Sequence, residues 1–133
     1  MHISVVVGTR PEIIKMASII KELESGRYTV TYDLVHTDQH YDQNLSMIFF
    51  RELELPQPHY HLNVGSGTQS QQTARAMVKL EELFQRTRPD VVLVEGDTNA
   101  VLAGALAAVK LGIQVGHVEA GLRSYDTRMP EEH

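Results

Sequence analysis

The chain has 133 residues and a mass of 14.9 kDa, a size that supports one hydrophobic core, so we expect a single domain. It carries 12 Lys and Arg against 17 Asp and Glu, a formal charge of −5 without a basic cluster, which excludes a nucleic-acid-binding face. The absence of cysteine excludes a disulfide scaffold and a zinc–thiolate site, and no apolar run reaches the roughly 18 residues of a membrane span. We therefore expect a soluble, cytoplasmic protein with no membrane or nucleic-acid partner.

The first half of the chain predicts two strands and two helices. Residues 3–7 are apolar and rich in β-branched side chains, which is typical of a strand buried on both faces of a parallel sheet. A helix over 11–24 follows, because Pro11 suits a first helical turn and apolar residues then recur at helical spacing. A second strand is predicted over 28–36 and a second helix over 42–53.

The second half predicts a helix over 68–87 capped by Thr68, a strand over 91–94, an alanine-rich helix over 98–111 and a last strand over 115–118. Strands that alternate with helices indicate right-handed β-α-β crossovers. The predicted fold class is therefore α/β, with a Rossmann-like, doubly wound parallel sheet.

Unusual polar residues follow the ends of the predicted strands. They are Thr9-Arg10, His36-Thr37-Asp38, Gly96-Asp97-Thr98 and Glu119. Because open parallel sheets bind ligands beyond the carboxyl ends of their strands, this clustering predicts a binding site at that edge of the sheet.

Two basic residues near the first strand could serve a phosphate group. Arg10 lies at the start of a helix, where a phosphate or diphosphate would be favoured, but it could instead be a surface arginine paired with Glu12 or another carboxylate. Lys15 is either a solvated or ion-paired helix residue or a residue that leans toward the crevice. The turn after the first strand lacks the G-x-G-x-x-G fingerprint, which disfavours NAD, and the chain contains no P-loop. The glycine-rich turn at 65–67 is either an anion-binding nest or an ordinary loop.

Several carboxylates are candidates for acid–base chemistry. Asp97 and Glu119 end neighbouring strands, and Glu131 and Glu132 follow a short loop. Asp97 could instead cap the helix that begins near Thr98. Three acids that converge on one crevice would supply a general base, a general acid and an orienting group.

The seven histidines do not have the spacing of a metal site. His36 and His40 lie on either side of a loop, and His59 and His61 share one face of a short extended segment. We expect these four to be structural or to contact substrate, His117 to be a hydrogen-bonded core residue, and no metal to be required.

The quoted segments together resemble the non-hydrolysing UDP-N-acetylglucosamine 2-epimerases. The stretches from His36 to Asp42 and from Phe49 to Pro56 also fit, so the resemblance covers nearly the whole chain. The motifs that carry it, in chain order, are Gly8-Thr9-Arg10-Pro11-Glu12 with Lys15, Gly96-Asp97-Thr98-Asn99, Gly116-His117-Val118-Glu119-Ala120-Gly121-Leu122-Arg123, and Pro130-Glu131-Glu132.

The resemblance implies that residues 1–133 form the N-terminal half of a B-type glycosyltransferase fold, with the active site between two Rossmann-like halves. In this family UDP is eliminated from UDP-N-acetylglucosamine to leave a 2-acetamidoglucal, and UDP adds back to give the manno epimer, UDP-ManNAc, for polysaccharide biosynthesis. The reaction requires no cofactor. The C-terminal domain of the family supplies most uridine and diphosphate contacts and a catalytic histidine, so we expect this chain to be inactive alone. A homodimer is also implied, and the helices at 11–24 and 68–87 are candidates for its surface.

Site residues carry over position by position from the resemblance. Asp97, Glu119 and Glu131 match the catalytic acids. Arg10, Lys15, Thr98 and Arg123 match substrate- and diphosphate-binding residues, and we expect Arg123 to organise the Glu119 loop by ion pairing. Members of the family bind a second substrate molecule as activator, and its site would include Gln39, His40, Gln43, Gln69 and Arg75.

Three other functions remain open. The substrate could be a UDP-2,3-diacetamido-glucuronate, because the stretches 122–125 and 128–130 also resemble that branch of the family. The chain could be a non-catalytic remnant that binds a sugar nucleotide or dimerises. A glycosyltransferase of the same fold is disfavoured, because three acids in these motifs serve proton transfer better than sugar transfer.

Overall fold

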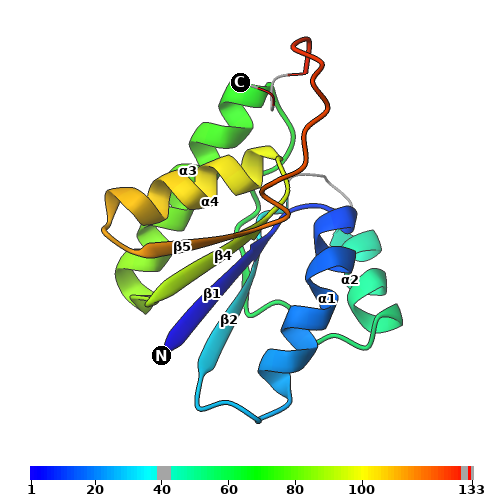
Figure 1. The fold of residues 1–133 in the computed structure, drawn as a ribbon, viewed down its shortest axis with the longest axis vertical. Coiled ribbons are helices and arrows are strands. Elements are labelled where there is room, and N and C mark those ends of the chain that lie inside the picture. The colour runs from blue at the N-terminus through cyan, green and yellow to red at the C-terminus, as the bar shows by residue number, and fades with distance from the viewer. Residues whose placement is uncertain (39–42, 130–131, 133) are drawn as a thin grey trace.

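A computed structural model describes residues 1–38, 43–129 and 132, with only the backbone of 43–46. Strands and helices alternate through the described residues, as the sequence predicts (Figure 1). In chain order the elements are β1 (His2–Val7), α1 (Arg10–Glu24), β2 (Thr31–His36), α2 (Gln43–Glu52), β3 (Tyr60–His61), α3 (Gln69–Thr87), β4 (Val91–Glu95), α4 (Asn99–Lys110) and β5 (Gln114–Val118).

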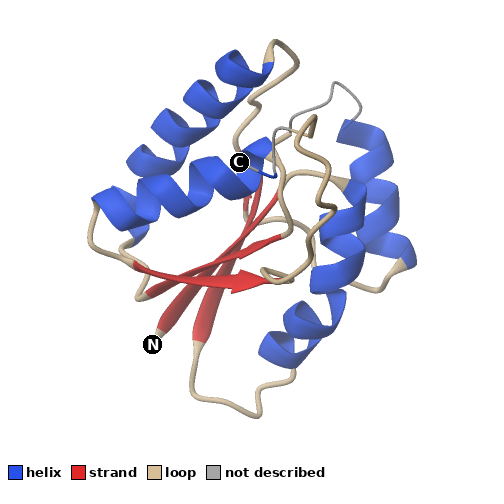
Figure 2. Ribbon diagram, turned by 45° about the horizontal axis from the view of Figure 1, so that its top comes forward, coloured by secondary structure: helices blue, strands red, loops and turns tan. Residues whose placement is uncertain are grey.

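The five strands form one parallel sheet in the order β3-β2-β1-β4-β5. The central strand β1 lies between β2 and β4, so Val5 is in register with Leu34 on one side and Leu93 on the other. Helices α1 and α2 cover one face of this sheet, and α3 and α4 cover the other (Figures 1 and 2). The predicted doubly wound, Rossmann-like sheet is confirmed.

The apolar run in β1 is continuous because both of its faces are buried. Ile3, Val5 and Val7 pack into the cluster under α1 and α2, while Val6 packs into the cluster under α3 and α4. Each of these four side chains is buried. Strand alternation thus divides one sequence run between two cores.

Local signals at the helix ends agree with the sequence analysis. The Thr68 hydroxyl accepts a hydrogen bond from the backbone N–H of Gln71 at 3.2 Å, so Thr68 is the N-cap of α3 as predicted. Gly112 follows α4 with a φ of 73°, a left-handed conformation that glycine adopts without strain. None of the described helices combines the length and the apolar character needed to cross a membrane.

Most predicted boundaries lie within one residue of the observed ones, but two predictions differ more. β2 begins at Thr31, so residues 28–30, which the sequence predicts to be part of this strand, lie outside it. The predicted extended segment around His59 and His61 contains a real but short strand, β3, whose Tyr60 is in register with Val35 of β2. This strand is too short to show a periodic pattern in the sequence.

The strand order reverses between β1 and β4. The chain leaves β1 toward the face covered by α1, and it leaves β4 toward the opposite face covered by α4. Such a switch point opens a crevice beyond the carboxyl ends of the strands, where parallel sheets of this class bind their ligands. The predicted site residues follow β1, β4 and β5 at this edge.

Candidate functional site

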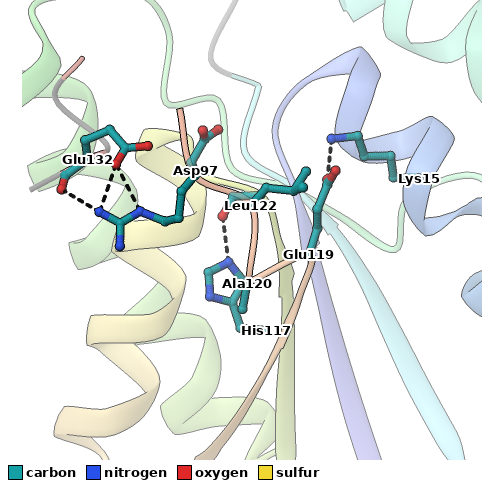
Figure 3. A pocket seen from close by; sticks show the side chains of 9 residues that line it. Lys15, Asp97, His117, Glu119, Ala120, Leu122 and Glu132 are labelled. Carbon is teal, nitrogen blue, oxygen red and sulfur yellow. Dashed lines mark hydrogen bonds and ion pairs between the residues drawn. The ribbon is translucent and has the colours of Figure 1, made fainter. Parts of the chain in front are cut away.

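An open pocket of about 330 Å³ lies beyond the carboxyl ends of β4 and β5 (Figure 3). It brings together four of the predicted site residues, namely Lys15, Asp97, Glu119 and Arg123. The other lining residues are Gly96, His117, Ala120, Leu122 and Glu132.

Lys15 of α1 lines this pocket and is also ion-paired, so both of its predicted alternatives hold. Its ammonium donates a hydrogen bond to the Glu119 carboxylate (Figure 3). The same ammonium Nζ lies 3.2 Å from Oε1 of Glu95, the last residue of β4. Lys15 is 47% exposed and Glu119 25%, whereas the Glu95 side chain is only 1% exposed. One lysine therefore joins a buried carboxyl group to one that borders the pocket.

The two carboxyl groups of this cluster have opposite pKa shifts. Burial, together with a hydrogen bond to Glu119, raises the pKa of Glu95 to about 7 against the attraction of Lys15. Hydrogen bonds from Glu95 and then Lys15 lower the pKa of Glu119. The two acidic partners also raise the pKa of Lys15. Near neutral pH the pair therefore retains a proton chiefly on Glu95, while Glu119 is ionised.

Asp97 is exposed at the pocket and is not the cap of the following helix. The N-cap of α4 is Thr98, so the structural alternative for Asp97 is wrong. In Figure 3 the Asp97 side chain projects into open space, and no described residue donates a hydrogen bond to its carboxylate. Its oxygens are therefore available to a ligand.

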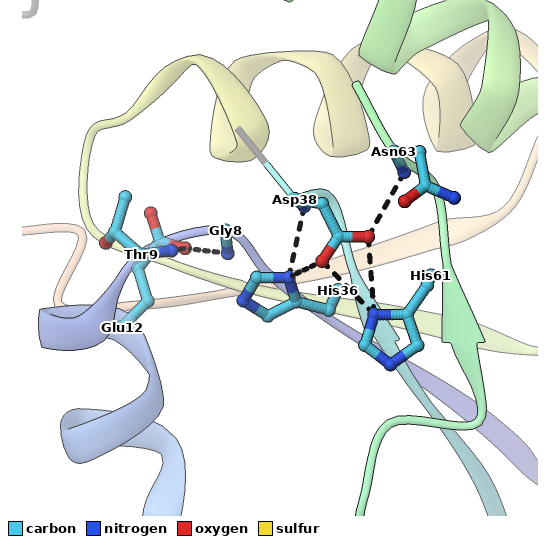
Figure 4. A network of polar contacts seen from close by, with 7 residues as sticks. All are labelled: Gly8, Thr9, Glu12, His36, Asp38, His61 and Asn63. Atoms are coloured by element: carbon cyan, nitrogen blue, oxygen red, sulfur yellow. Dashed lines mark hydrogen bonds and ion pairs between the residues drawn. The ribbon is translucent and has the colours of Figure 1, made fainter. Parts of the chain in front are cut away.

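Glu12 is buried beneath the loop that follows β1, with 2% exposure. Its carboxylate accepts hydrogen bonds from the backbone N–H groups of Gly8 and Thr9 and from the Thr98 hydroxyl (Figure 4 shows the Gly8 and Thr9 side). Burial raises the pKa of Glu12, and these hydrogen bonds oppose the rise. Glu12 is therefore not the exposed partner of Arg10 that the sequence left open. The Thr98 hydroxyl faces Glu12, and a contact of Thr98 with substrate stays a prediction.

Arg10, the first residue of α1, is exposed and lies against an aromatic ring. Its guanidinium carbon is 4.0 Å from the centre of the Phe49 ring, a cation–π contact that orients the side chain. Within the described part of the chain no carboxylate pairs with Arg10. An arginine without an acidic partner at a helix N-terminus suits a phosphate group.

Arg123 pairs with a different acid from the one predicted. Its guanidinium Nη2 lies 2.8 Å from Oε2 of Glu132, and its Nε donates to the same oxygen at 2.9 Å. The hydrogen bonds from Arg123 and from Ser124 lower the pKa of Glu132 to about 2. The expected ion pair between Arg123 and Glu119 is wrong, because Lys15 occupies Glu119 instead. Arg123 therefore closes the 123–132 loop on itself at the rim of the pocket.

Three residues on the β2–β3 side of the sheet form a compact polar cluster (Figure 4). Asp38 lies 2.6 Å from His36 Nδ1 and 3.1 Å from His61 Nδ1, and it accepts the backbone N–H of Asn63 at 3.1 Å. Burial opposes ionisation of Asp38, but the hydrogen bonds from both histidines outweigh it and lower its pKa. The 2.6 Å between Asp38 and His36 Nδ1 is a hydrogen-bond distance, since ligand atoms at about 2.1 Å from a tetrahedral zinc lie roughly 3.4 Å apart. The donor set resembles a metal site, but its spacing is that of a structural network.

Other sequence expectations have mixed outcomes. His117 is hydrogen-bonded as expected, donating to the Gly96 carbonyl at 2.6 Å, but it is exposed at the pocket rather than in the core. The 65–67 turn holds the Arg75 guanidinium, which donates to the Ser66 carbonyl at 2.6 Å, as in an ordinary loop. Gln69 is exposed at the start of α3. An activator site at Gln69 and Arg75 stays a prediction.

Some predicted residues lie outside the described part of the chain. They are Gln39, His40 and Glu131, together with the side chain of Gln43.

Sequence reasoning missed Glu95 and misjudged Glu12. Both carboxylates are buried, Glu95 at the end of β4 and Glu12 in the first turn of α1. A signal for Glu95 was present, because an acid that ends an otherwise apolar strand must find a partner when it is buried. Lys15, which contacts Glu95, and Thr98, which contacts Glu12, come from distant segments, and a single sequence does not reveal such contacts.

Comparisons with known proteins agree with this geometry. A family model described as UDP-N-acetylglucosamine 2-epimerase matches residues 21–133. A UDP-N-acetylglucosamine 2-epimerase of Methanocaldococcus jannaschii is 54% identical over 132 residues, covering 99% of this chain and 36% of the relative. A UDP-2,3-diacetamido-2,3-dideoxy-D-glucuronate 2-epimerase of Pseudomonas aeruginosa is 46% identical, covering 99% of this chain and 37% of the relative. The chain thus spans about a third of the length of the curated relatives it matches.

Solved structures give the same result. A crystal structure of the M. jannaschii UDP-GlcNAc 2-epimerase in complex with UDP-GlcNAc and UDP superposes with a TM-score of 0.92 at 54% identity, over 99% of this chain and 36% of that one. A Streptomyces glycosyltransferase complexed with thymidine diphosphate superposes with a TM-score of 0.61 at 16% identity, over 88% of this chain and 38% of that one. The second similarity concerns the fold alone.

Proposed function

The chain belongs to the UDP-N-acetylglucosamine 2-epimerase family, and we propose that it forms the N-terminal half of an isomerase that converts UDP-GlcNAc to UDP-ManNAc. The observation that carries this proposal is the pocket itself. Asp97, which pairs with none of the described residues, and Lys15-bound Glu119 border one open space beyond the carboxyl ends of two adjacent parallel strands.

The reaction makes a specific demand on acid and base groups. Carbon 2 of the sugar is not next to a carbonyl group, so its proton is hardly acidic until UDP begins to leave carbon 1. Inversion then requires a proton to depart on one face and arrive on the other. Asp97 and Glu119 approach the pocket from different loops, one after β4 and one after β5. We assign proton transfer to these two acids, with Glu131 as the third acid by family resemblance.

The departing UDP carries negative charge that must be stabilised. We assign this role to Arg10 at the N-terminus of α1, where the guanidinium fork and the helix dipole both favour a phosphate. Lys15 lies on the same helix and adds a second positive charge at the pocket. Thr98 and Arg123 are the further binding residues that the resemblance indicates.

A second domain completes the site in this proposal. The pocket of about 330 Å³ is open and lies at the small end of the roughly 300–1,000 Å³ of ligand sites, although UDP-GlcNAc is a large ligand. The relatives are about three times as long as this chain, and we assign the opposite wall to a counterpart of the part that this chain does not match. We also place the reaction in the cytoplasm and its product in polysaccharide biosynthesis, as the family resemblance implies.

A homodimer is the assembly we propose for the whole protein. Exposed apolar side chains gather on α4, where Leu102, Leu106 and Val109 follow one another at helical spacing. The predicted helix surfaces at 11–24 and 68–87 expose fewer such residues, Ile14 and Val78. Sedimentation of wild type and of Leu106→Glu tests whether a second copy of the chain binds to α4. A charge at this position would weaken such a dimer, so the variant should sediment as a smaller species than wild type.

A second candidate substrate is UDP-2,3-diacetamido-glucuronate. It is favoured by the 46% identity to the Pseudomonas relative that bears that name. The two sugars differ in their acetamido and carboxyl substituents. The described residues of the pocket do not discriminate between these substituents.

The experiment that tests the function joins this chain to the part of the M. jannaschii relative that it does not match. The chimera is incubated with each UDP-sugar in turn, and the products are followed by proton NMR. We expect UDP-GlcNAc to be converted. Conversion of the diacetamido sugar alone would favour the second candidate. A folded chimera that converts neither, beside an active natural relative, would indicate a non-catalytic chain.

A further inference from the structure

We propose that Glu95 is a positioning residue that holds a proton in a hydrogen bond to Glu119, and thereby keeps the Glu119 carboxylate ionised at the pocket. The use of Glu119 as a base rests on the proposed function, whereas the sharing of the proton is a property of the Lys15–Glu95–Glu119 cluster alone. The family resemblance does not include Glu95 among the catalytic acids.

The backbone brings Glu95 and Glu119 together from adjacent strands. Glu95 is in register with Val118, the last residue of β5, and Glu119 follows directly. Glu119 has a φ of 64°, in the left-handed region that is strained for a residue with a side chain. This turn carries the Glu119 carboxylate to the Lys15 ammonium on α1. A strained residue held in this way indicates that its side-chain position is imposed by the fold.

The charges of the cluster do not balance unless one acid is neutral. Lys15 contributes one positive charge, and two ionised carboxylates would leave a net negative charge beside the buried end of β4. Protonation of one acid makes the cluster neutral. The proton belongs on Glu95, because it is 1% exposed and an ionised carboxylate is least tolerated there. The raised pKa of Glu95 and the lowered pKa of Glu119 agree with this arrangement.

Other charged groups near this edge face different partners. The Glu12 carboxylate is bound to the loop after β1 and to Thr98, and the His117 ring donates to the Gly96 carbonyl. Asp97 forms no hydrogen bond within the described part of the chain. Among the described residues, Lys15 from α1 and Glu119 from the end of β5 are thus the charged groups that contact Glu95.

The consequence is that the protonation state of Glu119 depends on the buried residue Glu95. A neutral Glu95 donates a hydrogen bond to Glu119 and thereby stabilises the ionised form of Glu119. An ionised Glu95 has no proton and could not donate this hydrogen bond. When Glu95 loses its proton, near pH 7, two carboxylates compete for Lys15 and the support of Glu119 is lost. A glutamine at this position would donate the same hydrogen bond at every pH, whereas a leucine would donate none.

Carbon-13 NMR of the full chain, labelled at the glutamate carboxyl groups, tests this proposal without substrate. In wild type we expect the Glu95 carboxyl group to titrate near pH 7. Burial also raises the pKa of Glu12, so the Glu12 signal is first identified by its loss in Glu12→Gln. The Glu95 signal should disappear in Glu95→Gln, with Glu119 still titrating below its ordinary value, and Glu119 should titrate higher in Glu95→Leu. Glu81→Gln, an exposed position on α3, is the matched control and should remove only its own signal.

Three results would overturn the proposal: no carboxyl group other than Glu12 that titrates above pH 6, a signal near pH 7 other than that of Glu12 that survives Glu95→Gln, or a Glu119 titration that is the same in all variants. If Glu95→Leu does not fold, Lys15→Met tests the same cluster. Loss of the Lys15 cation should raise the pKa of Glu95. These results do not depend on epimerase activity, so a failure of the proposed function leaves them interpretable. In an active chimera, Glu95→Gln should flatten the pH–rate profile around pH 7, which a merely structural role would not do.

Discussion

The hydroxyl of Thr98 donates a hydrogen bond to the buried carboxylate of Glu12, and this contact joins the two loops that diverge at the switch point of the sheet. The same carboxylate accepts the backbone N–H groups of Gly8 and Thr9. Glu12 thus holds the start of α1, with Arg10 and Lys15 on it, in a fixed position relative to the loop that carries Asp97. Glu12 therefore positions both sides of the site, although we assign it no contact with a ligand.

Two substitutions of Glu12 distinguish the stability contributed by its hydrogen bonds from the stability contributed by its charge. Glu12→Ala leaves two buried N–H donors without an acceptor and should lower the free energy of unfolding by about 2–3 kcal/mol. Glu12→Gln should cost less than about 1 kcal/mol, because its carbonyl accepts from the backbone and its amide donates to the Thr98 oxygen. Urea unfolding of the two variants measures the difference. Equal losses in both would show that the charge, and not the hydrogen bonds, is what the loop requires.

Asp97→Asn should abolish turnover of the chimera while the free energy of unfolding changes by less than about 0.5 kcal/mol. The reason is that the carboxylate is exposed and caps no helix, so an isosteric amide removes only its proton-transfer capacity. Asp126→Asn, which removes an acid that pairs with Arg128 outside the pocket, is the control for activity. A large drop in the melting temperature of Asp97→Asn would reveal a structural role for this residue.

The raised pKa of Glu95 predicts a pH-dependent stability. A carboxyl group with a folded-state pKa near 7 and an ordinary unfolded value stabilises the protein fully below about pH 4.5, and this contribution is lost as the pH rises toward 7. The stability of wild type relative to Glu95→Gln should therefore fall by on the order of 2 kcal/mol between pH 4.5 and 8. Unfolding curves of both proteins at several pH values provide the comparison. A constant difference would mean that Glu95 is not protonated in the folded chain.

The ion pair of Arg123 with Glu132 predicts an acid-sensitive loop. The lowered pKa of Glu132 means that its contribution to loop order is present above about pH 4.5 and is lost as the pH falls toward 2. Glu132→Gln should therefore increase proteolytic cleavage within 123–132 at neutral pH. A matched change, Glu81→Gln on α3, should leave cleavage there unaltered. If cleavage of this loop is equal in all three proteins, the ion pair does not order it.

Much of the fold could be predicted because its signals are local. The apolar run of β1, the Thr68 cap and the glycine after α4 each depend on neighbouring residues, and the structure confirms all three. Strand β3 escaped prediction as a strand because two residues have no periodicity.

The site was only partly predictable, since its contacts are long-range. The strand-end rule placed Asp97 and Glu119 at one pocket correctly. It could not show that Glu119 pairs with Lys15 rather than with Arg123, because the choice depends on which helix lies across the crevice. The burial of Glu95 likewise follows from tertiary packing.

The most direct test of the central claim is proton exchange at carbon 2 of UDP-GlcNAc in D₂O, followed by proton NMR. For the chimera we predict loss of the carbon 2 proton signal together with formation of the manno epimer, and neither event with Asp97→Asn. This chain alone should show no exchange, because its pocket is open and in our proposal a second domain completes it. Epimerisation with retention of the original proton, or unchanged exchange in Asp97→Asn, would contradict the account that this pocket carries the proton-transfer groups.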